Sequence, residues 1–261
     1  MAFELEALVG HLYVVGGRAI NMMPPGALVE VAPRKAARGR ETDTLFIQVL
    51  PGGDEAAPAA FYEQMAALAA ERYFNSTGSV TAALRHVFHV LNENLYEHNQ
   101  NEKRRFEASL VCAGLRSADL YLARAGAGVA VLYQNGAAQE FPDAFEHDEA
   151  LFGLPLGVQP VPVVKMSNYR VGEGVRLLLS DATLADIERS TISAALAAGS
   201  LPDLLGIIKG AVPIQINLAA IEFVPAEAQV AVPVRPAESS RAGVSAPPPA
   251  SVSLPPSRAW V

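Results

Sequence analysis

Asp181 is the residue whose position most directly predicts chemistry. It follows the apolar run at the start of "LLLSDATLAD" and so stands at the end of an expected buried strand. A carboxylate at such a place can hold a hard cation through oxygen or accept a proton from a bound water. Either task needs further polar groups nearby.

Four possible metal ligands lie on one expected helix: His86, His89, Glu93 and Glu97. They share one side, as the ligands of a metal site on a helix would. That side lies opposite an apolar stripe that ends in Leu95. The arrangement therefore favours a solvated helix surface over a metal site.

The cysteine, two of the histidines and the glycine-rich stretch of the chain lack the neighbouring residues that catalysis or cofactor binding would require. Cys112, the only cysteine, lies in the apolar run "SLVCAGL", which predicts a buried and unreactive thiol. His11 and His147 have no evident serine or cysteine partner for a catalytic triad. The "GAG" at 126–128 lacks the third glycine of a dinucleotide loop, because Val131 stands there, and it joins two strands rather than opening a helix.

The composition predicts a globular protein of moderate acidity. Of the 261 residues, 51% are hydrophobic and 18% are charged, and the net charge is −7. Apart from "RKAARGR" there is no basic run, so nucleic acid is excluded as an expected partner. The segment "MAFELEALVG" does not have the pattern of a signal peptide, and no apolar run of about 18 residues occurs. We expect a cytoplasmic protein.

Two regions of different composition predict a domain at 1–225 and a tail at 226–261. The tail is rich in proline, alanine and serine, as in "APPPAS" and "LPPSR", and cannot form a core. It ends in "SRAWV". A basic residue followed by tryptophan is also typical of the approach to a membrane segment, which would require the chain to continue beyond Val261. An ordinary flexible end is the alternative.

Within the domain, runs of strands and pairs of helices predict an α+β architecture with antiparallel sheets. Helices are expected at 59–74, 80–98, 184–196 and 201–208. Strands are expected at 44–50, 108–115, 118–125, 128–134, 138–141, 161–171, 175–180 and 216–224. The three strands between 108 and 134 are interpreted as an antiparallel meander, and Asn135–Gly136 as the turn that follows it.

The order of these elements resembles the metal-dependent serine/threonine phosphatases of the PPM type. The resemblance depends on "GVAVLYQNGAAQEF", "LGVQP", "VGEGVRLLLSDATLADI" and "KGAVPIQINLAAIEFV", and it extends over about residues 5–225. It implies an α-β-β-α sandwich, in which two packed antiparallel sheets are flanked by helix pairs. It also implies a site for two hard cations, manganese or magnesium, held by carboxylates around an attacking water.

Most of the ligand positions implied by the resemblance are not acidic in this chain. Only Asp181 remains, and Ala182 replaces the glycine expected after it. The other positions fall on Met22 and Met23 after "GGRAIN", on Leu50 and Pro51, on Ala127, and on Ile216 and Asn217. The sequence therefore predicts that no metal cofactor is bound and that no catalytic residue is present.

A different alignment of the first 50 residues would bring other acids to the site: Glu41, Asp43, Asp54 and Glu55. Even so, the implied ligand positions at Ala127 and at 216–217 would still have no acidic residue, because no acid lies between Arg124 and Tyr133 or between Lys209 and Ala220. Arg18 is a candidate for the phosphate-contacting arginine of some family members. A surface arginine without that role is the alternative.

Three hypotheses on function follow from the resemblance. The first is a degenerate, pseudophosphatase-like domain that binds a protein, such as a phosphoprotein or a component of a kinase pathway. The second is a residual metal-dependent phosphatase that uses Asp181 with manganese or magnesium and non-standard ligands. The third is a structural or assembly module tethered by its tail.

Overall fold

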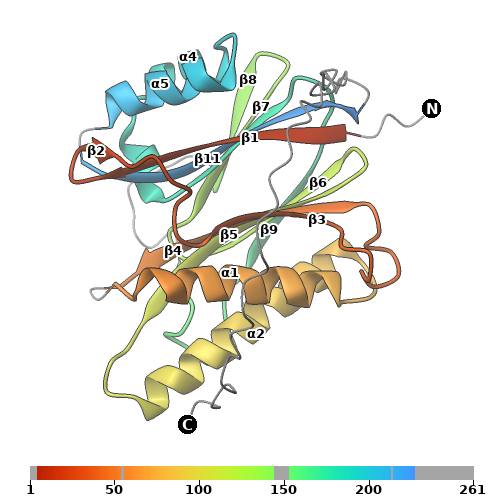
Figure 1. The fold of residues 1–261 in the computed structure, drawn as a ribbon, viewed down its shortest axis with the longest axis vertical. Helices are drawn as coiled ribbons and strands as arrows, with labels where there is room; N and C mark the ends of the chain where they lie inside the picture. The colour runs from red at the N-terminus through yellow and green to blue at the C-terminus, as the bar shows by residue number, and fades with distance from the viewer. Residues whose placement is uncertain (1–4, 54–55, 144–152, 213, 227–261) are drawn as a thin grey trace, which may run out of the picture. The chain divides into compact units, whose positions relative to one another are not determined.

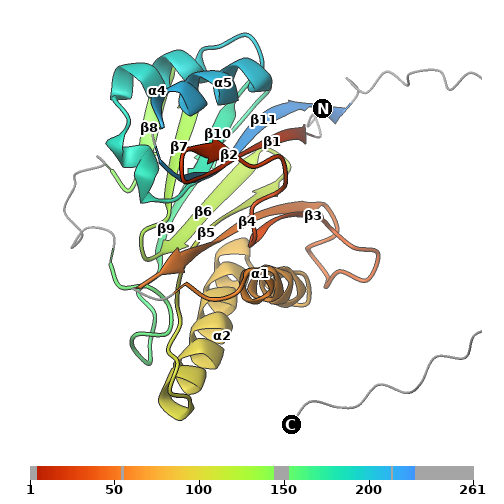
Figure 2. The same cartoon turned by 60° about the vertical axis from the view of Figure 1, so that its left-hand side comes forward.

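The computed structural model of the chain describes residues 5–53, 56–143, 153–212 and 214–226. Two antiparallel sheets pack face to face, and helices cover the outer face of each sheet (Figures 1 and 2). This is the α+β sandwich predicted from the sequence. Among the described helices, none is both long and apolar enough to span a bilayer.

Sheet A has six strands in the order β2-β1-β11-β10-β7-β8. Their bounds are β2 Arg18–Ala19, β1 Leu5–Val15, β11 Ile216–Pro225, β10 Arg176–Ser180, β7 Val129–Gln134 and β8 Ala137–Phe141. Sheet B has five strands in the order β3-β4-β5-β6-β9. Their bounds are β3 Ala27–Val31, β4 Asp43–Gly52, β5 Glu107–Arg116, β6 Asp119–Ala125 and β9 Lys165–Arg170.

Each sheet has its own helices. α1 (Ala59–Phe74) and α2 (Val80–Asn101) cover sheet B, while the 3₁₀ helix η1 (Ala182–Asp186), α4 (Arg189–Leu196) and α5 (Leu201–Ala211) cover sheet A. Serine side chains cap two of them, since Ser79 Oγ accepts from Ala82 N–H and Ser200 Oγ accepts from Asp203 N–H. Such caps satisfy amides that have no partner inside the helix.

Three apolar layers hold the sandwich together. One lies between α1, α2 and sheet B, one between the two sheets, and one between sheet A and its helices. The alternation of strand side chains explains the layers: in β4, Leu45 and Ile47 face the helices, whereas Phe46 and Leu50 face sheet A. The apolar stripe of α2 predicted from the sequence is buried along its length.

The expected meander between 108 and 134 was wrong. β5 pairs with β6, but β6 pairs next with β9, and β7 belongs to sheet A between β10 and β8. The chain crosses between the sheets at Gly126–Gly128. Gly126 has a positive φ of 73° and leaves space for Ser109, whose Oγ would be 2.4 Å from an added Cβ. The Asn135–Gly136 turn is confirmed, with positive φ at both residues.

The expected helix at 184–196 is two elements. η1 ends at Asp186 and α4 begins at Arg189, because Ile187 and Glu188 have extended backbone angles. Ile187 is buried in the layer between sheet A and its helices, so packing directs the chain away from a continuous helix. The strand expected at 161–171 covers only Lys165–Arg170, and β1, β2 and β3 were not assigned from the sequence.

Candidate functional site

The positions implied by the resemblance gather at one end of the sandwich. Leu50, near the end of β4, pairs with Ser109 of β5, and the Ser109 hydroxyl accepts a hydrogen bond of 2.9 Å from the N–H of Ala127. Asn217, at the start of β11, bonds directly to Asp181. Ile214 O accepts from Gly17 N–H, which brings the turn between β1 and β2 to the same end.

Asp181 has both carboxylate oxygens occupied by main-chain amides. Oδ1 accepts from Thr183 N–H at 3.0 Å and so caps η1, while Oδ2 accepts from Asn217 N–H at 2.8 Å. Burial raises the pKa of Asp181, and these hydrogen bonds partly offset that effect. The carboxylate therefore joins β11 to the start of η1, a structural task that does not require a metal ion.

A polar bridge between the sheets lies beside Asp181. Gln48 of β4 is fully buried and faces sheet A, and its Nε2 donates to the main-chain carbonyl of Asn217 at 2.8 Å and to the Asn217 side-chain oxygen. The Ser180 hydroxyl donates to the same carbonyl at 3.2 Å. Sequence reasoning missed Gln48. The available signal was one polar residue at an inward position of the apolar run "TLFIQVL".

The side chains at the implied ligand positions Leu50 and Ala127 are apolar, although buried polar side chains, Ser109 and Arg124, lie near them. Leu50 is 1% exposed and packs in the layer between the two sheets. Ala127 is half-buried, and its amide is bound to Ser109. Neither side chain offers an oxygen atom, so the acids that a dinuclear site needs at these positions have no substitute.

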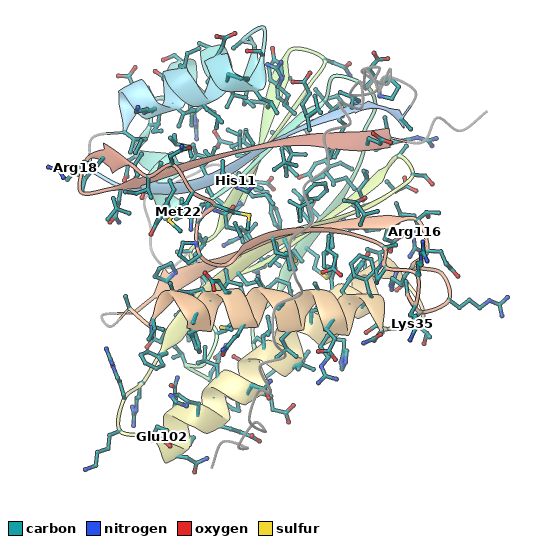
Figure 3. The ribbon with its side chains drawn as sticks, in the orientation of Figure 1. His11, Arg18, Met22, Lys35, Glu102 and Arg116 are labelled. Carbon is teal, nitrogen blue, oxygen red and sulfur yellow. The ribbon has the colours of Figure 1, made fainter. Side chains whose placement is uncertain are left out.

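Exposed apolar side chains surround the turn between β1 and β2. We call this set the apolar rim: Val15, Ile20, Met22, Met23 and Ile214, each between 37% and 63% exposed. Main-chain hydrogen bonds bring parts of the set to the same end of the sandwich, because Ile20 N–H donates to Tyr13 O and Ile214 O accepts from Gly17 N–H. Figure 3 shows Met22 on the connection that passes from sheet A to sheet B.

Arg18 lies on β2 and is exposed. Its side chain extends outward at the margin of the molecule, away from Met22 (Figure 3). Its main chain pairs with Val15. The geometry therefore places a positive charge at the edge of the apolar rim.

The side chains at this end do not fit a pair of hard cations. Such ions take several oxygen ligands each. Among the described positions at which the resemblance implies a ligand, only Asp181 has a carboxylate, and it already binds two amides. Methionine thioethers at 22 and 23 are soft donors that suit other metals. Over the described ranges of the chain, no three histidine, cysteine, aspartate or glutamate side chains lie close enough together to hold a metal ion.

Asp43, one of the acids that another alignment would recruit, belongs to a different cluster. It is fully buried and accepts from Arg40 Nη1 at 3.2 Å, from the Tyr73 hydroxyl at 2.7 Å and from Arg116 Nε at 2.7 Å. It begins β4, seven residues from Leu50, or about 23 Å along an extended strand. Asp43 therefore cannot share a site with Asp181.

The remaining acids of that alternative add no ligand within the described residues. Glu41 is exposed and accepts from Gly39 N–H at 2.7 Å, which contributes to a pKa below the ordinary value. Asp54 and Glu55 lie outside the described residues.

The other candidate groups lie away from this end or have no catalytic geometry. The four histidine and glutamate side chains of α2 are exposed, as a solvated surface requires. Cys112 is buried on β5, and burial raises the pKa of its thiol, which disfavours the reactive thiolate. Burial lowers the pKa of His11, whose Nδ1 is buried without a hydrogen-bond partner. His147 lies outside the described residues.

Comparison with known proteins identifies the fold. No family model matches the sequence, and no curated protein matches it. Solved structures do match. PppA, described as a key regulatory component of T6SS in Pseudomonas aeruginosa, is 15% identical with a TM-score of 0.60, over 84% of this chain and 98% of that one.

Two further structures are serine/threonine phosphatases. The enzyme from S. agalactiae is 11% identical with a TM-score of 0.61, over 84% of this chain and all of that one. The catalytic domain of PstP, solved with two manganese ions, is 15% identical with a TM-score of 0.58, over 85% of this chain and 99% of that one. The chain therefore has the fold of the PPM-type serine/threonine phosphatases, as its sequence predicted.

Proposed function

We propose that this chain is a degenerate, pseudophosphatase-like domain that works by binding another protein through the apolar rim. The proposal depends mainly on the hydrogen bonding of Asp181: its two carboxylate oxygens accept hydrogen bonds from the main-chain amides of Thr183 and Asn217. Leu50 and Ala127 beside it supply no ligand. The end of the fold that would hold metal ions is thus built as part of the hydrophobic and hydrogen-bonded interior.

The apolar rim supports a binding role. Met22 and Met23 are 61% and 53% exposed although they are large and hydrophobic. Exposed apolar side chains that gather in one region are typical of protein interaction sites, and methionine adapts to partners of different shape. Arg18 at the margin adds a positive charge that suits an acidic or phosphorylated partner segment. We therefore propose a phosphoprotein, or a component of a kinase pathway, as the partner.

A residual metal-dependent phosphatase is the second candidate. Its support is the likeness of the fold to solved phosphatases, one of which holds two manganese ions. In that case Asp181 would need to give up the amide of Thr183 or of Asn217 to bind a cation. Asp54 and Glu55, which lie outside the described residues, would have to supply further oxygens.

A metal-binding and hydrolysis assay separates the two candidates. Calorimetry with manganese and magnesium, and hydrolysis of an aryl phosphate, are measured for the chain and for Asp181→Asn. We expect no saturable metal binding and no metal-dependent turnover in either protein. Turnover that depends on manganese and is lost in Asp181→Asn would establish the phosphatase instead.

The binding surface is tested with a doubly substituted chain, Met22→Glu with Met23→Glu. Partners cross-linked to the wild-type chain in cells should be depleted at least tenfold with this variant. The matched control is Leu154→Glu, which changes a side chain of similar exposure outside the apolar rim. Equal loss with the control would count against the apolar rim as the binding surface.

A further inference from the structure

β1 leaves one edge of sheet A open. Its inner edge pairs with β11 continuously from Leu5 to Val14. On its outer edge, β2 pairs only with Val14 and Val15, and Figures 1 and 2 show β2 beside one end of β1. Along Leu5–Leu12 the outer edge has no neighbouring strand among the described residues.

The direction of the unpaired groups follows from one hydrogen bond. Ile20 N–H donates to Tyr13 O at 2.8 Å, so the main-chain groups of Tyr13 point to the outer edge. These groups alternate in direction along an antiparallel strand. The N–H and C=O of Ala7, Val9 and His11 therefore point outward too, and no described main-chain hydrogen bond reaches them.

The open edge of β1 has few of the features that protect an edge strand from pairing, and Glu6 is its one acidic residue. Leu5–Tyr13 contains no lysine, arginine or proline, and its continuous register with β11 excludes a bulge. The other described sheet edges are shorter or charged. β3 and β8 have five residues each, and β9 carries Lys165 and Arg170 at its ends.

A hollow beside this edge accepts an apolar side chain. It has a volume of about 480 Å³ and is bounded by Leu8, Gly10, Leu201, Pro202 and Leu205 on the helix side of sheet A. Gly10 has no side chain, and Leu205 packs over it, because a Cβ at Gly10 would lie 2.9 Å from Leu205 Cδ1. Leu8, two residues away on the same face, is 49% exposed. The edge thus has an exposed side chain, Leu8, beside a hollow that can receive the corresponding side chain of another chain.

We propose that β1 pairs with β1 of a second copy of this chain. A twofold axis perpendicular to the sheet keeps each residue on its own face, so outward-pointing residues pair with outward-pointing residues. With the axis at Val9, Ala7 pairs with His11 of the partner subunit and Val9 with itself. The pairing forms about six main-chain hydrogen bonds, two at each of three residue pairs.

This register explains the arrangement of Leu8 and Gly10. Leu8 of each copy lies opposite Gly10 of the partner subunit, above the hollow bounded by Leu201 and Leu205. An exposed leucine beside a hollow two residues away is self-complementary about a twofold axis, because Leu8 of each copy then lies next to the hollow of the other. The inference concerns the β1 edge alone and does not depend on the proposed function of the apolar rim.

Sedimentation velocity of the full chain at increasing concentration tests the pairing. We expect a monomer–dimer equilibrium, a dissociation constant at least tenfold weaker in Leu8→Arg, and an unchanged constant in Val31→Arg. Val31 is the matched control because it is exposed on the edge strand of sheet B. A monomer at every concentration would overturn the proposal, as would a dimer that Leu8→Arg leaves intact or that Val31→Arg also weakens.

Cross-linking tests the register in the same chain. Val9→Cys should form a disulfide-linked dimer under mild oxidation, because the α-carbons of a hydrogen-bonded strand pair lie about 5.5 Å apart. Hydrogen exchange of residues 5–12 should slow as the protein concentration rises. Slow hydrogen exchange of residues 5–12 in a chain that sediments as a monomer would mean that another segment of the same chain protects the β1 edge. That result would overturn the proposed pairing.

Discussion

Gln48 of β4 and Asn217 of β11 join the two sheets directly, through the donation of Gln48 Nε2 to the main-chain carbonyl of Asn217. The hydrogen bond crosses the largely apolar layer between the sheets, at the end of the sandwich where Asp181 lies. It connects the two halves of the fold at the end where the sequence resemblance implies ligand positions.

The contribution of this bridge to stability can be measured with a double-mutant cycle. Gln48→Leu should lower the free energy of unfolding by about 1–3 kcal/mol, because it leaves the Asn217 side-chain oxygen buried without a donor. Adding Asn217→Val should restore part of the loss, since both polar side chains are then removed. Urea unfolding of the four proteins gives the coupling energy. Strictly additive effects would contradict the bridge.

Asp181→Ala should lower the free energy of unfolding by about 1–2 kcal/mol, because it removes the cap of η1 and the acceptor for Asn217 N–H. The effect depends on pH. Because burial raises the pKa of Asp181, its ionisation is harder in the folded chain than in the unfolded chain. Its contribution is therefore largest below the ordinary carboxyl pKa and falls as the pH rises through the raised pKa.

Urea unfolding of both proteins from about pH 4 upward checks this dependence. The difference between wild type and Asp181→Ala should shrink with rising pH. Glu93→Ala, which changes an exposed carboxylate on α2, serves as the control and should show no such trend. A difference that grows with pH would mean that the carboxylate is stabilised in the folded chain.

Asp43→Asn should be the most destabilising of the single acid substitutions, by about 3–5 kcal/mol, because it leaves Arg40 buried without its counter-charge. Arg40 and Asp43 are both fully buried and 3.2 Å apart. Glu41→Gln, two residues away and exposed, is the matched control and should change stability little. Thermal and urea unfolding measure both. A small effect of Asp43→Asn would contradict a structural role for this cluster.

Cys112 should react with a thiol reagent only when the chain unfolds. Its side chain is buried, and burial raises the pKa of the thiol. The labelling rate with a disulfide reagent should rise at least a hundredfold in denaturant. Leu154→Cys with Cys112→Ala provides an exposed thiol as the control, and this thiol should react at once in the native chain.

Removal of residues 226–261 should leave the melting transition of the domain unchanged. The last strand, β11, ends at Pro225, and its pairing with β1 and β10 involves no residue beyond that point. Differential scanning calorimetry of the two chain lengths measures the transition. A lower transition temperature in the shorter chain would extend the domain past the predicted boundary.

The sequence predicted the architecture because its hydrophobic residues recur with the regular spacing of helices and strands. The buried stripe of α2 and the strand at Leu177 are visible from residue types alone. The crossing at Gly126 was not predictable, because a period of two shows that a run is a strand but not which sheet contains it. The break at Ile187 was missed for a similar reason, since only tertiary packing sets it.

The candidate site was predictable only in part. Asp181, Leu50 and Ala127 could be located by their order in the chain. The partners of Asp181 are main-chain amides, which no side-chain pattern reveals. The cluster around Asp43 joins residues as far apart as Arg116, 73 positions away, so local spacing gives no sign of it.

Gly126 and Ala127 are neighbours in the chain, but the fold constrains them very differently. At 126 a methyl group would collide with the Ser109 hydroxyl at 2.4 Å and approach Pro155 Cα at 3.1 Å, so the crossing between the sheets tolerates no side chain. At 127 the structure uses only the amide, which any residue other than proline provides. Folding therefore restricts residue 126 to glycine, whereas the side chain of residue 127 can change without loss of the crossing between the sheets.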